Sequence, residues 1–351
     1  MALSDVALPL LRCFDPERAH RFAIKALKCG LGPQKSDISD PFLASSLWGM
    51  DFPNPVGLAA GFDKNAEVTG QMLNTGFGFV EAGSLTPKAQ PGNPQPRIFR
   101  LLEDRAIINR LGFNNNGVMD AASRLKDRPK GIIGINLGKN KSSEDAASDY
   151  AFGAKYLAPL CDYLVINVSS PNTPGLRALQ GTKELTRLIS ATQKAMAESC
   201  DDKTPPLLVK IAPDLTDEDK QDIADVALAS GIQGLIISNT TISRPDGLSE
   251  RRLAHQTGGL SGKPLFDLST QVLHEMYKLT QGKLPLIGVG GISSGQDAYI
   301  KIKAGASLVQ LYSALVYEGF GLIPRINKDL ILLAQADGFK SISQAIGTDH
   351  K

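Results

Sequence analysis

The sequence is poor in the residues that hold small cross-linked or metal-stabilised folds together. It has only four cysteines, four histidines and one tryptophan in 351 residues. The cysteines are widely spaced and form no cluster with the histidines, which excludes a disulfide framework and a structural zinc site. We therefore expect no metal centre, and we expect the protein to work in a reducing, cytoplasmic compartment.

An excess of charge of one sign is also absent. Lys and Arg number 38 against 36 Asp and Glu, a net charge of +2, so no extended field is present that would hold a nucleic-acid backbone. No apolar run approaches the roughly 18 residues that a membrane span needs, and the N-terminus shows neither a secretory leader nor a transit peptide. The glycine motifs of nicotinamide dinucleotide folds and of P-loop proteins are missing as well.

What the chain does contain is eight short apolar runs. They begin at Val56, Phe79, Ile132, Tyr163, Leu207, Gly234, Pro285 and Leu308. Because they are apolar at nearly every position, they fit parallel strands that are buried on both faces. Stretches of helical periodicity lie between several of them, such as 216–230, which starts at Thr216 with an acidic first turn and stops before Gly231. Eight strand–helix units predict a (β/α)8 barrel, that is, a TIM barrel.

The longest intervals follow the second, fourth and sixth runs. The polar segments NRLGFNNNG, SSPNTPGLR and SNTTISRPDG lie in them. Connections of that length are typically binding loops, and in a barrel the loops after the strands form the active-site face. We therefore expect the functional site there.

Residues 1–45 precede the first run and differ from the rest. Asp15 followed by Pro16 indicates a helix start and Gly30 a helix end, with an apolar stripe between them. One interpretation is a helical flap that closes the bottom of the barrel. The other is an amphipathic pair of segments, with 3–14 as the first, lying at a bilayer surface with five basic residues near lipid headgroups: Arg12, Arg18, Arg21, Lys25 and Lys28. We divide the chain into a helical extension, 1–45, and a barrel domain, 46–351.

Glycines gather at the ends of the last two predicted strands, in GVGGIS from Gly288 and in GASLVQLYS, which ends at Ser313. Close-packed glycines expose backbone N–H groups, and barrels often bind a phosphate between these two loops. The pattern favours a phosphorylated ligand. The alternative is two tight turns selected for packing.

Two lysines lie at strand ends, Lys64 after the first run and Lys210 within the fifth. A buried ammonium is costly unless an anion meets it, so each implies a substrate carboxylate, a cofactor that becomes anionic on reduction, or a neighbouring Asp or Glu. The other polar residues at these ends are uncharged: Asn109, Asn136, Asn167, Ser170, Asn172, Thr173, Ser238, Asn239 and Thr240. Asparagine matches the donor–acceptor edge of a pyrimidine or of a flavin ring, so this set predicts a flat, amide-rich ligand.

These segments closely resemble the dihydroorotate dehydrogenases, specifically the quinone-dependent, membrane-associated class 2 enzymes. The resemblance covers nearly the whole chain, through DPERAH, AAGFDKN, EAGSLTPKAQPGNPQPRIFR, NRLGFNN, NVSSPNTPGLR, VKIAPDL, SNTT, GGLSGKPL, GVGGI and GASLVQLYS. It implies an FMN-dependent oxidation of (S)-dihydroorotate to orotate, the redox step of pyrimidine synthesis, with the electrons leaving to a membrane quinone.

Matched residue by residue, the resemblance implies three binding sites. The FMN site would comprise Ala59, Ala60, Gly61, Lys64, Ser84, Asn136, Asn167, Lys210, Ser238, Gly262, Gly291, Tyr312 and Ser313. The dihydroorotate site would comprise Lys64, Asn109, Arg110, Leu111, Gly112, Phe113, Asn167, Asn172, Asn239 and Thr240. The quinone site would comprise His20, Arg97 and Tyr312. Ser84 and Ser238 stand where many relatives carry threonine, and since either hydroxyl can donate we expect little effect.

Ser170 matches the position of the catalytic base, where the soluble class 1 relatives place a cysteine, so the serine favours class 2. We expect a proton to leave substrate C5 toward Ser170 while a hydride leaves C6 toward the flavin. Ser170 would pass its own proton to Thr173 or to a water. Lys210 would favour the anionic reduced flavin.

The class 2 resemblance also implies that residues 1–45 give access to the quinone, as a peripheral contact on the cytoplasmic side of the cell inner membrane. We expect a monomer. Two alternatives remain open: a class 1-like FMN dehydrogenase that reduces a soluble acceptor, and a non-catalytic membrane-associated sensor of a phosphorylated ligand. A sensor would not need Ser170 beside an asparagine-lined site.

Overall fold

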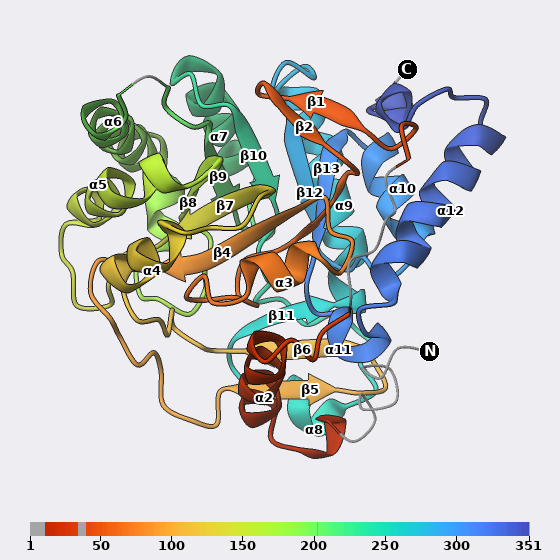
Figure 1. Ribbon diagram of the computed structural model, residues 1–351, viewed down its shortest axis with the longest axis horizontal. Coiled ribbons are helices and arrows are strands. Elements are labelled where there is room, and N and C mark those ends of the chain that lie inside the picture. The colour runs from red at the N-terminus through yellow and green to blue at the C-terminus, as the bar shows by residue number, and fades with distance from the viewer. Residues whose placement is uncertain (1–10, 34–39, 202, 351) are drawn as a thin grey trace.

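In the computed structural model, which describes residues 11–33, 40–201 and 203–350, eight parallel strands close into a barrel (Figure 1). Each strand pairs with the next along the chain, and the last pairs with the first, with Val309 opposite Val56. The strands are β3 (Val56–Leu58), β4 (Phe79–Leu85), β7 (Ile132–Leu137), β8 (Tyr163–Asn167), β9 (Leu207–Ile211), β10 (Gly234–Ile237), β12 (Leu286–Val289) and β13 (Ala306–Leu311). They match the eight apolar runs, so the predicted (β/α)8 barrel is confirmed.

Helices cover the outside of the barrel. They are α3 (Thr69–Leu73), α4 (Val118–Leu125), α5 (Ala146–Leu157), α6 (Thr182–Ser199), α7 (Asp217–Ala229), α9 (Phe266–Leu279), α10 (Gly295–Lys303) and α12 (Leu322–Ala336). The described residues also form the short helices α8 (Arg251–Ala254) and α11 (Leu315–Glu318) and the 3-10 turns η1 (Ala158–Leu160), η2 (Arg177–Gln180), η3 (Lys263–Leu265), η4 (Ile342–Ala345) and η5 (Thr348–His350). Helix α7 starts where predicted, because Thr216 and Asp219 exchange side chain to backbone hydrogen bonds in a capping box.

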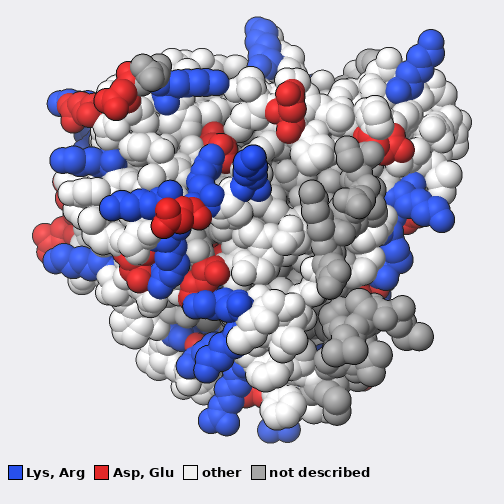
Figure 2. Space-filling model, in the orientation of Figure 1, with Lys and Arg blue, Asp and Glu red and all other residues white. Residues whose placement is uncertain are grey.

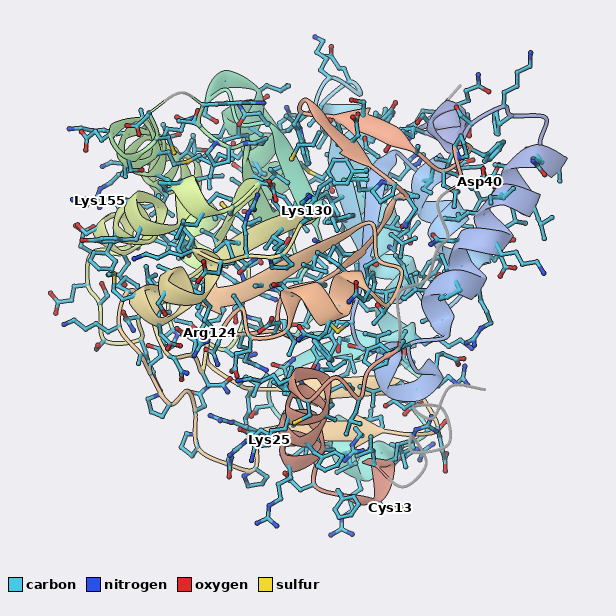
Figure 3. All side chains as sticks on the ribbon, in the orientation of Figure 1. Cys13, Lys25, Asp40, Arg124, Lys130 and Lys155 are labelled. Carbon is cyan, nitrogen blue, oxygen red and sulfur yellow. The ribbon has the colours of Figure 1, made fainter. Side chains whose placement is uncertain are left out.

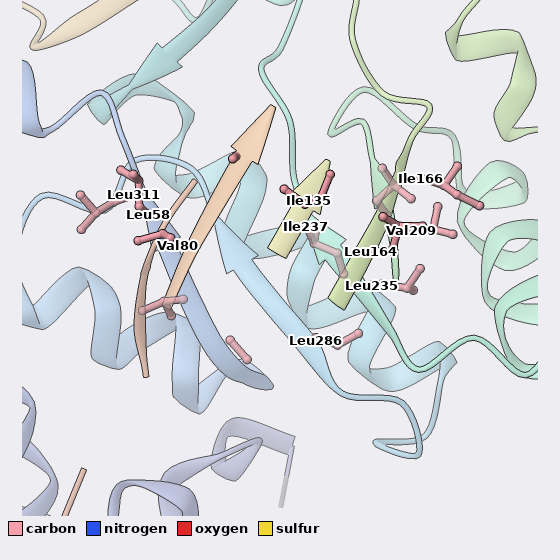
Figure 4. Close-up of a cluster of buried hydrophobic side chains, with 14 of the residues drawn as sticks. Leu58, Val80, Ile135, Leu164, Ile166, Val209, Leu235, Ile237, Leu286 and Leu311 are labelled. Atoms are coloured by element: carbon pink, nitrogen blue, oxygen red, sulfur yellow. The ribbon is translucent and has the colours of Figure 1, made fainter. Parts of the chain in front are cut away.

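The main hydrophobic core lies between the barrel and these helices. Strand side chains such as Leu58, Val80, Ile135, Leu164 and Val209 belong to it (Figure 4). Burying one aliphatic side chain contributes roughly 1.5–3 kcal/mol, so this layer stabilises the scaffold on which the loops are mounted.

A hairpin of two short strands, β1 (Ser45–Leu47) and β2 (Met50–Phe52), closes the amino-terminal end of the barrel. The ring of Phe52 meets that of Phe79 edge-on at 5.4 Å, and Trp48 lies 6.2 Å from both Phe52 and Tyr163. Phe79 and Tyr163 are the first residues of their strands and are fully buried. The prediction of a helical flap at this end is wrong, because these aromatic rings already fill the opening.

The opposite end of the barrel carries a second, antiparallel sheet made of β5 (Ile98–Leu101), β6 (Ala106–Asn109) and β11 (Gly259–Gly262) (Figure 1). We call it the roof sheet. Strands β5 and β6 come from the long interval after the second barrel strand, and β11 comes from the interval after the sixth. Where the sequence predicts long binding loops, the structure therefore has a small sheet with its own core of Leu101, Ala106, Ile108 and Leu260.

Helix α2 (Pro16–Lys28) packs beside β5, at the roof-sheet end of the barrel (Figure 1). Its predicted cap is confirmed, because the Asp15 carboxylate accepts a hydrogen bond from the N–H of Arg18 at 2.9 Å. Lys25 lies at this end of the molecule and Asp40 at the other (Figure 3). Of the predicted apolar segment 3–14, residues 3–10 lie outside the described residues.

The surface around α2 combines charged and apolar side chains. Phe14 and Phe22 are each 61% exposed and Leu31 is 73% exposed. Lys and Arg side chains lie beside uncharged surface at this end of the molecule (Figure 2). The Arg12 guanidinium, which one interpretation of the sequence places near lipid headgroups, donates to the carbonyls of Val316 and Tyr317. Within the described ranges, none of the helices combines the length and the apolar character that crossing a membrane requires.

Candidate active site

A cavity of about 480 Å³ extends from the carboxyl ends of the barrel strands to the inner face of α2. The predicted site residues that line it are His20, Ala59, Ala60, Gly61, Lys64, Ser84, Asn109, Leu111, Gly112, Phe113, Asn167, Ser170, Asn172, Lys210, Ser238, Asn239, Thr240, Gly262, Gly291, Tyr312 and Ser313. Residues from seven of the eight strand ends and from the roof sheet thus meet in one space. Asn136, Arg110 and Arg97 are not part of its walls.

The floor of the cavity is a hydrogen-bonded set of amides and a hydroxyl. The Asn167 amide donates to Ser84 Oγ at 2.9 Å and to Asn136 Oδ1 at 3.0 Å, and the Ser84 hydroxyl donates to the same Asn136 oxygen. Asn136 is fully buried one layer below the cavity surface. Its amide therefore orients Ser84 and Asn167, and the structure gives it no wall position of its own.

Beneath this floor lies a carboxylate that the sequence analysis missed. Glu81 is fully buried inside the barrel and accepts hydrogen bonds from Asn136 Nδ2 at 2.8 Å, Gln310 Nε2 at 2.7 Å and the Tyr163 hydroxyl at 3.2 Å. Three donors make a buried carboxylate tolerable. The sequence could have revealed this carboxylate, because Glu81 is the one charged residue of the apolar run FVEAGS.

Two further pairs of polar residues continue the wall. Asn239 donates through Nδ2 to Ser169 Oγ at 2.9 Å, and Ser169 in turn donates to Asn167 Oδ1 at 2.7 Å. Across the cavity, Asn172 Nδ2 lies 3.3 Å from Asn109 Oδ1, which links the loop after β8 to the roof sheet. The structure thus brings together the asparagines that the sequence analysis grouped as a site for a flat, amide-rich ligand.

The two strand-end lysines face the cavity without a carboxylate partner. Within the described part of the chain, neither Lys64 nor Lys210 has an Asp or Glu oxygen within salt-bridge distance. Burial lowers the pKa of Lys64 to about 8 and also lowers the pKa of Lys210, although Glu81 opposes the second shift. Of the three predicted partners for these lysines, a neighbouring acidic side chain is therefore not the one that the structure shows. Both ammonium groups are placed to meet a bound anion.

Ser170 stands in the cavity wall on the loop that follows β8. It is buried, and its Oγ accepts a hydrogen bond from the N–H of Asn172 at 3.3 Å. Within the described residues, no hydrogen bond joins its hydroxyl to a histidine, a carboxylate or Thr173. Ser170 is therefore available to a ligand, and a route for its proton through Thr173 stays a prediction.

The glycine turn after β12 forms the far wall of the cavity together with the start of the segment after β13. Gly290 and Gly291 have positive φ angles of 112° and 77°, and a Cβ at Gly291 would lie 2.5 Å from the Cα of Phe266. In the same wall, the Ser313 hydroxyl lies 2.8 Å from that of Ser261, on the roof sheet. Crowded backbone and two hydroxyls at this place suit a phosphate better than an apolar group.

At the α2 end, the cavity wall is aromatic. The His20 ring stands edge-on to Phe62 at 5.3 Å, Phe62 stands edge-on to Tyr312 at 5.5 Å, and His20 Nε2 lies 3.5 Å from Lys64 Nζ. Burial and the nearby Lys64 charge lower the pKa of His20 to about 3, so its imidazole is neutral at physiological pH. A neutral, largely aromatic entrance suits an apolar ring compound.

Two predicted site residues are held away from the cavity. The Arg97 guanidinium forms a two-point ion pair with Glu17 of α2, at 2.7 and 2.9 Å, and also donates to the carbonyls of Pro91 and Asn93. The Arg97 hydrogen bonds, outweighing burial, lower the pKa of Glu17 to about 2. Arg110 stacks on the ring of Phe99 at 4.5 Å and donates to Gln256 Oε1 and to the carbonyl of Pro96. Arg97 therefore fixes α2 to the loop that leads into β5 of the roof sheet, and Arg110 links that loop to the residues before β11.

Comparison with known proteins agrees with this geometry. The protein-family model for dihydroorotate dehydrogenase matches residues 42–333. The chain is 58% identical over 347 residues to the dihydroorotate dehydrogenase (quinone) of Rhodospirillum rubrum, covering 99% of this chain and 94% of that one. It is 54% identical to the mitochondrial dihydroorotate dehydrogenase (quinone) of Mus musculus, covering 99% and 90%.

Solved structures give the same result. The crystal structure of the DHODH from Eimeria tenella in complex with ferulenol aligns with a TM-score of 0.92 at 45% identity, covering 96% of each chain. The family match spans most of the sequence, and the relatives span nearly all of it. The chain therefore belongs to the dihydroorotate dehydrogenase family.

Proposed function

We propose that this protein oxidises (S)-dihydroorotate to orotate with FMN as its cofactor and passes the electrons to a membrane quinone, in the synthesis of pyrimidine nucleotides. Membership of the family implies a flavin. The observation that carries the proposal is Ser170 in an asparagine-lined cavity that the buried Lys210 and the half-buried Lys64 also line. Among the described residues, neither lysine has a carboxylate within salt-bridge distance.

The residues fit FMN in particular. The glycine turn at Gly290 and Gly291 and the hydroxyls of Ser313 and Ser261 would hold its phosphate. Asn167 and Lys210 would meet the polar edge of its ring, where the Lys210 ammonium stabilises negative charge. FMN bound there supplies the two-electron acceptor that no side chain provides.

The pyrimidine acid would lie between the roof sheet and the loop after β8. Asn109, Asn172 and Asn239 offer donors and acceptors to its amide groups, and Lys64 offers an ammonium to its carboxylate. The Asn172 amide donates to Asn109 Oδ1 at 3.3 Å, and this contact orients both side chains at the same part of the cavity.

Ser170 would take the proton that leaves C5 of the substrate. A serine hydroxyl is a weak base, so it must release its own proton as it accepts one, to a water or to Thr173. The asparagine contacts stabilise the charge that gathers on the substrate ring during this transfer.

The quinone would enter between α2 and the barrel, along the wall of His20, Phe62 and Tyr312. The exposed Phe14, Phe22 and Leu31 suit peripheral contact with the cytoplasmic face of the inner membrane, with the protein as a monomer. Arg97 would act here indirectly, by fixing α2 through Glu17.

An anaerobic absorption experiment tests the proposal. The purified protein should show a flavin spectrum, dihydroorotate should bleach it, and a ubiquinone analogue should restore it, whereas fumarate and NAD⁺ should not. Restoration by a soluble acceptor alone would favour the class 1-like alternative. A colourless protein that takes up no FMN would refute the assignment.

A further inference from the structure

Three successive loops at the carboxyl end of the barrel are joined by one side chain outside the cavity. Arg177, the first residue of η2, donates through Nε to the carbonyl of Ser169 at 3.1 Å, through Nη1 to Asp214 at 2.8 Å and through Nη2 to the carbonyl of Thr240 at 2.9 Å. These acceptors belong to the loops after β8, β9 and β10. Neither Arg177 nor Asp214 lines the cavity.

Asp214 secures the other side of this junction. Its carboxylate accepts from the Thr241 hydroxyl, from the N–H of Ile242 at 3.1 Å and from the Ser243 hydroxyl at 3.1 Å, in addition to Arg177. The pair is mostly buried, with 21% and 13% of the two side chains exposed. Burial strengthens such an ion pair when further hydrogen bonds satisfy its donors and acceptors, and here Arg177 has two carbonyl acceptors and Asp214 has three further donors.

The groups that Arg177 holds are next to those that would do the chemistry. The Ser169 carbonyl precedes the backbone N of Ser170, and Thr240 lies in the cavity wall beside Asn239. The segment between β8 and η2 has no regular secondary structure of its own, so side-chain contacts must set its backbone. For a weak base such as a serine hydroxyl, displacement by about 1 Å costs as much as 10²-fold in rate.

We propose that Arg177, clamped by Asp214, is a positioning residue that sets the backbone of Ser169 and Ser170 against the Thr240 loop for dihydroorotate oxidation. The proposal rests on the proposed function. The planar guanidinium directs N–H groups at fixed angles toward three acceptors. A lysine ammonium has the same charge but cannot reproduce this geometry.

The chain offers a matched control at the other end of the same strand. Asp162 directly precedes β8, and Arg128 binds it at two points, 2.7 and 2.8 Å. This second pair has 30% and 22% of its side chains exposed and is likewise fully within the described residues. Arg128→Lys thus removes a comparable arginine fork from β8 without touching the cavity.

The experiment measures anaerobic flavin reduction by dihydroorotate in the wild-type holoenzyme, Arg177→Lys and Arg128→Lys, with the melting temperature of each. We expect Arg177→Lys to lower the limiting reduction rate about 100-fold while the substrate concentration for half-maximal rate changes less than threefold. Arg128→Lys should change the rate less than twofold at a similar loss of melting temperature. In Arg177→Gly, added methylguanidinium should restore part of the rate, which a purely structural role would not permit.

A wild-type rate in Arg177→Lys, or equal rate losses in the two lysine variants without rescue, would overturn the proposal. If Arg177→Lys does not retain flavin, the limiting rate of flavin reduction is measured in Asp214→Asn instead. A lowered rate supports the positioning role and a normal rate refutes it. If the wild-type flavin is not reduced at all, the proposed function fails and this inference falls with it. A reduced wild type with insensitive variants refutes the positioning role alone.

Discussion

The same eight strands form both ends of the barrel, but one end is closed by packed side chains and the other holds a cavity. At the amino-terminal end, the rings of Trp48, Phe52, Phe79 and Tyr163 fill the opening and exclude water. At the carboxyl end, asparagines, serines and two lysines line a cavity, and the buried carboxylate of Glu81 lies beneath its floor. Tyr163 belongs to both, since its ring packs in the aromatic layer while its hydroxyl donates to Glu81. The difference shows that tight aromatic packing closes one end of the barrel and that the polar groups gather at the other.

The strongest test of this division is Ser170→Ala, at the cavity end. Flavin reduction by dihydroorotate should slow by about 10²- to 10⁴-fold, because the base that takes the C5 proton is lost. Flavin content and melting temperature should stay near wild type, since Ser170 Oγ makes one 3.3 Å hydrogen bond. Stopped-flow absorbance measures the rate, with Ser170→Cys as the control that retains a base. Near-normal reduction in the alanine variant would remove Ser170 from this role.

The converse change is Phe52→Ala, at the aromatic end. The free energy of unfolding in urea should fall by about 3–5 kcal/mol, because a fully buried ring leaves a cavity among Trp48, Phe79 and its neighbours. The rate of flavin reduction in the folded protein should change less than twofold. Phe14→Ala, at a 61% exposed ring, is the control and should cost about 0.5 kcal/mol or less. Slowed chemistry in Phe52→Ala would mean that the two ends are coupled.

The smallest expected effect is the pH dependence of orotate binding. The pKa of Lys64, lowered to about 8 by burial, means that the free protein loses the ammonium proton as the pH rises through that value. Since the ligand carboxylate needs the charged form, the Kd for orotate should be flat below pH 7 and rise by up to about tenfold per pH unit above 8. Titrations of the flavin spectrum between pH 6.5 and 9.5 measure it. Lys64→Gln should bind weakly at every pH; a wild-type Kd that does not vary with pH would contradict the assignment of Lys64.

The barrel could be predicted from the sequence because eight apolar runs are a strong and repeated signal. Many of the residues that line the cavity could be grouped from the sequence because they lie at or after the ends of such runs, whereas His20 and Arg97 were proposed on the resemblance alone. The pairing of β6 with β11 in the roof sheet could not be predicted, since these strands lie about 150 residues apart and leave no local pattern. The hairpin at 45–52 could not be predicted either, because strands of three residues are too short to show an alternating pattern. The burial of Arg97 could not be predicted either. Its partner Glu17 is distant in the sequence, so the residues around Arg97 look the same as those around a solvated charge in a proline-rich loop.

The roof sheet also bears on how this pocket could be transferred to another scaffold. Its central strand, β6, pairs on one side with β5 and on the other with β11, which arrives from a separate insertion. Grafting only the first insertion would leave one edge of β6 unpaired, exposing backbone groups that invite aggregation. An engineer who wished to move the Asn109 side of the pocket into a different barrel would have to transplant both insertions together.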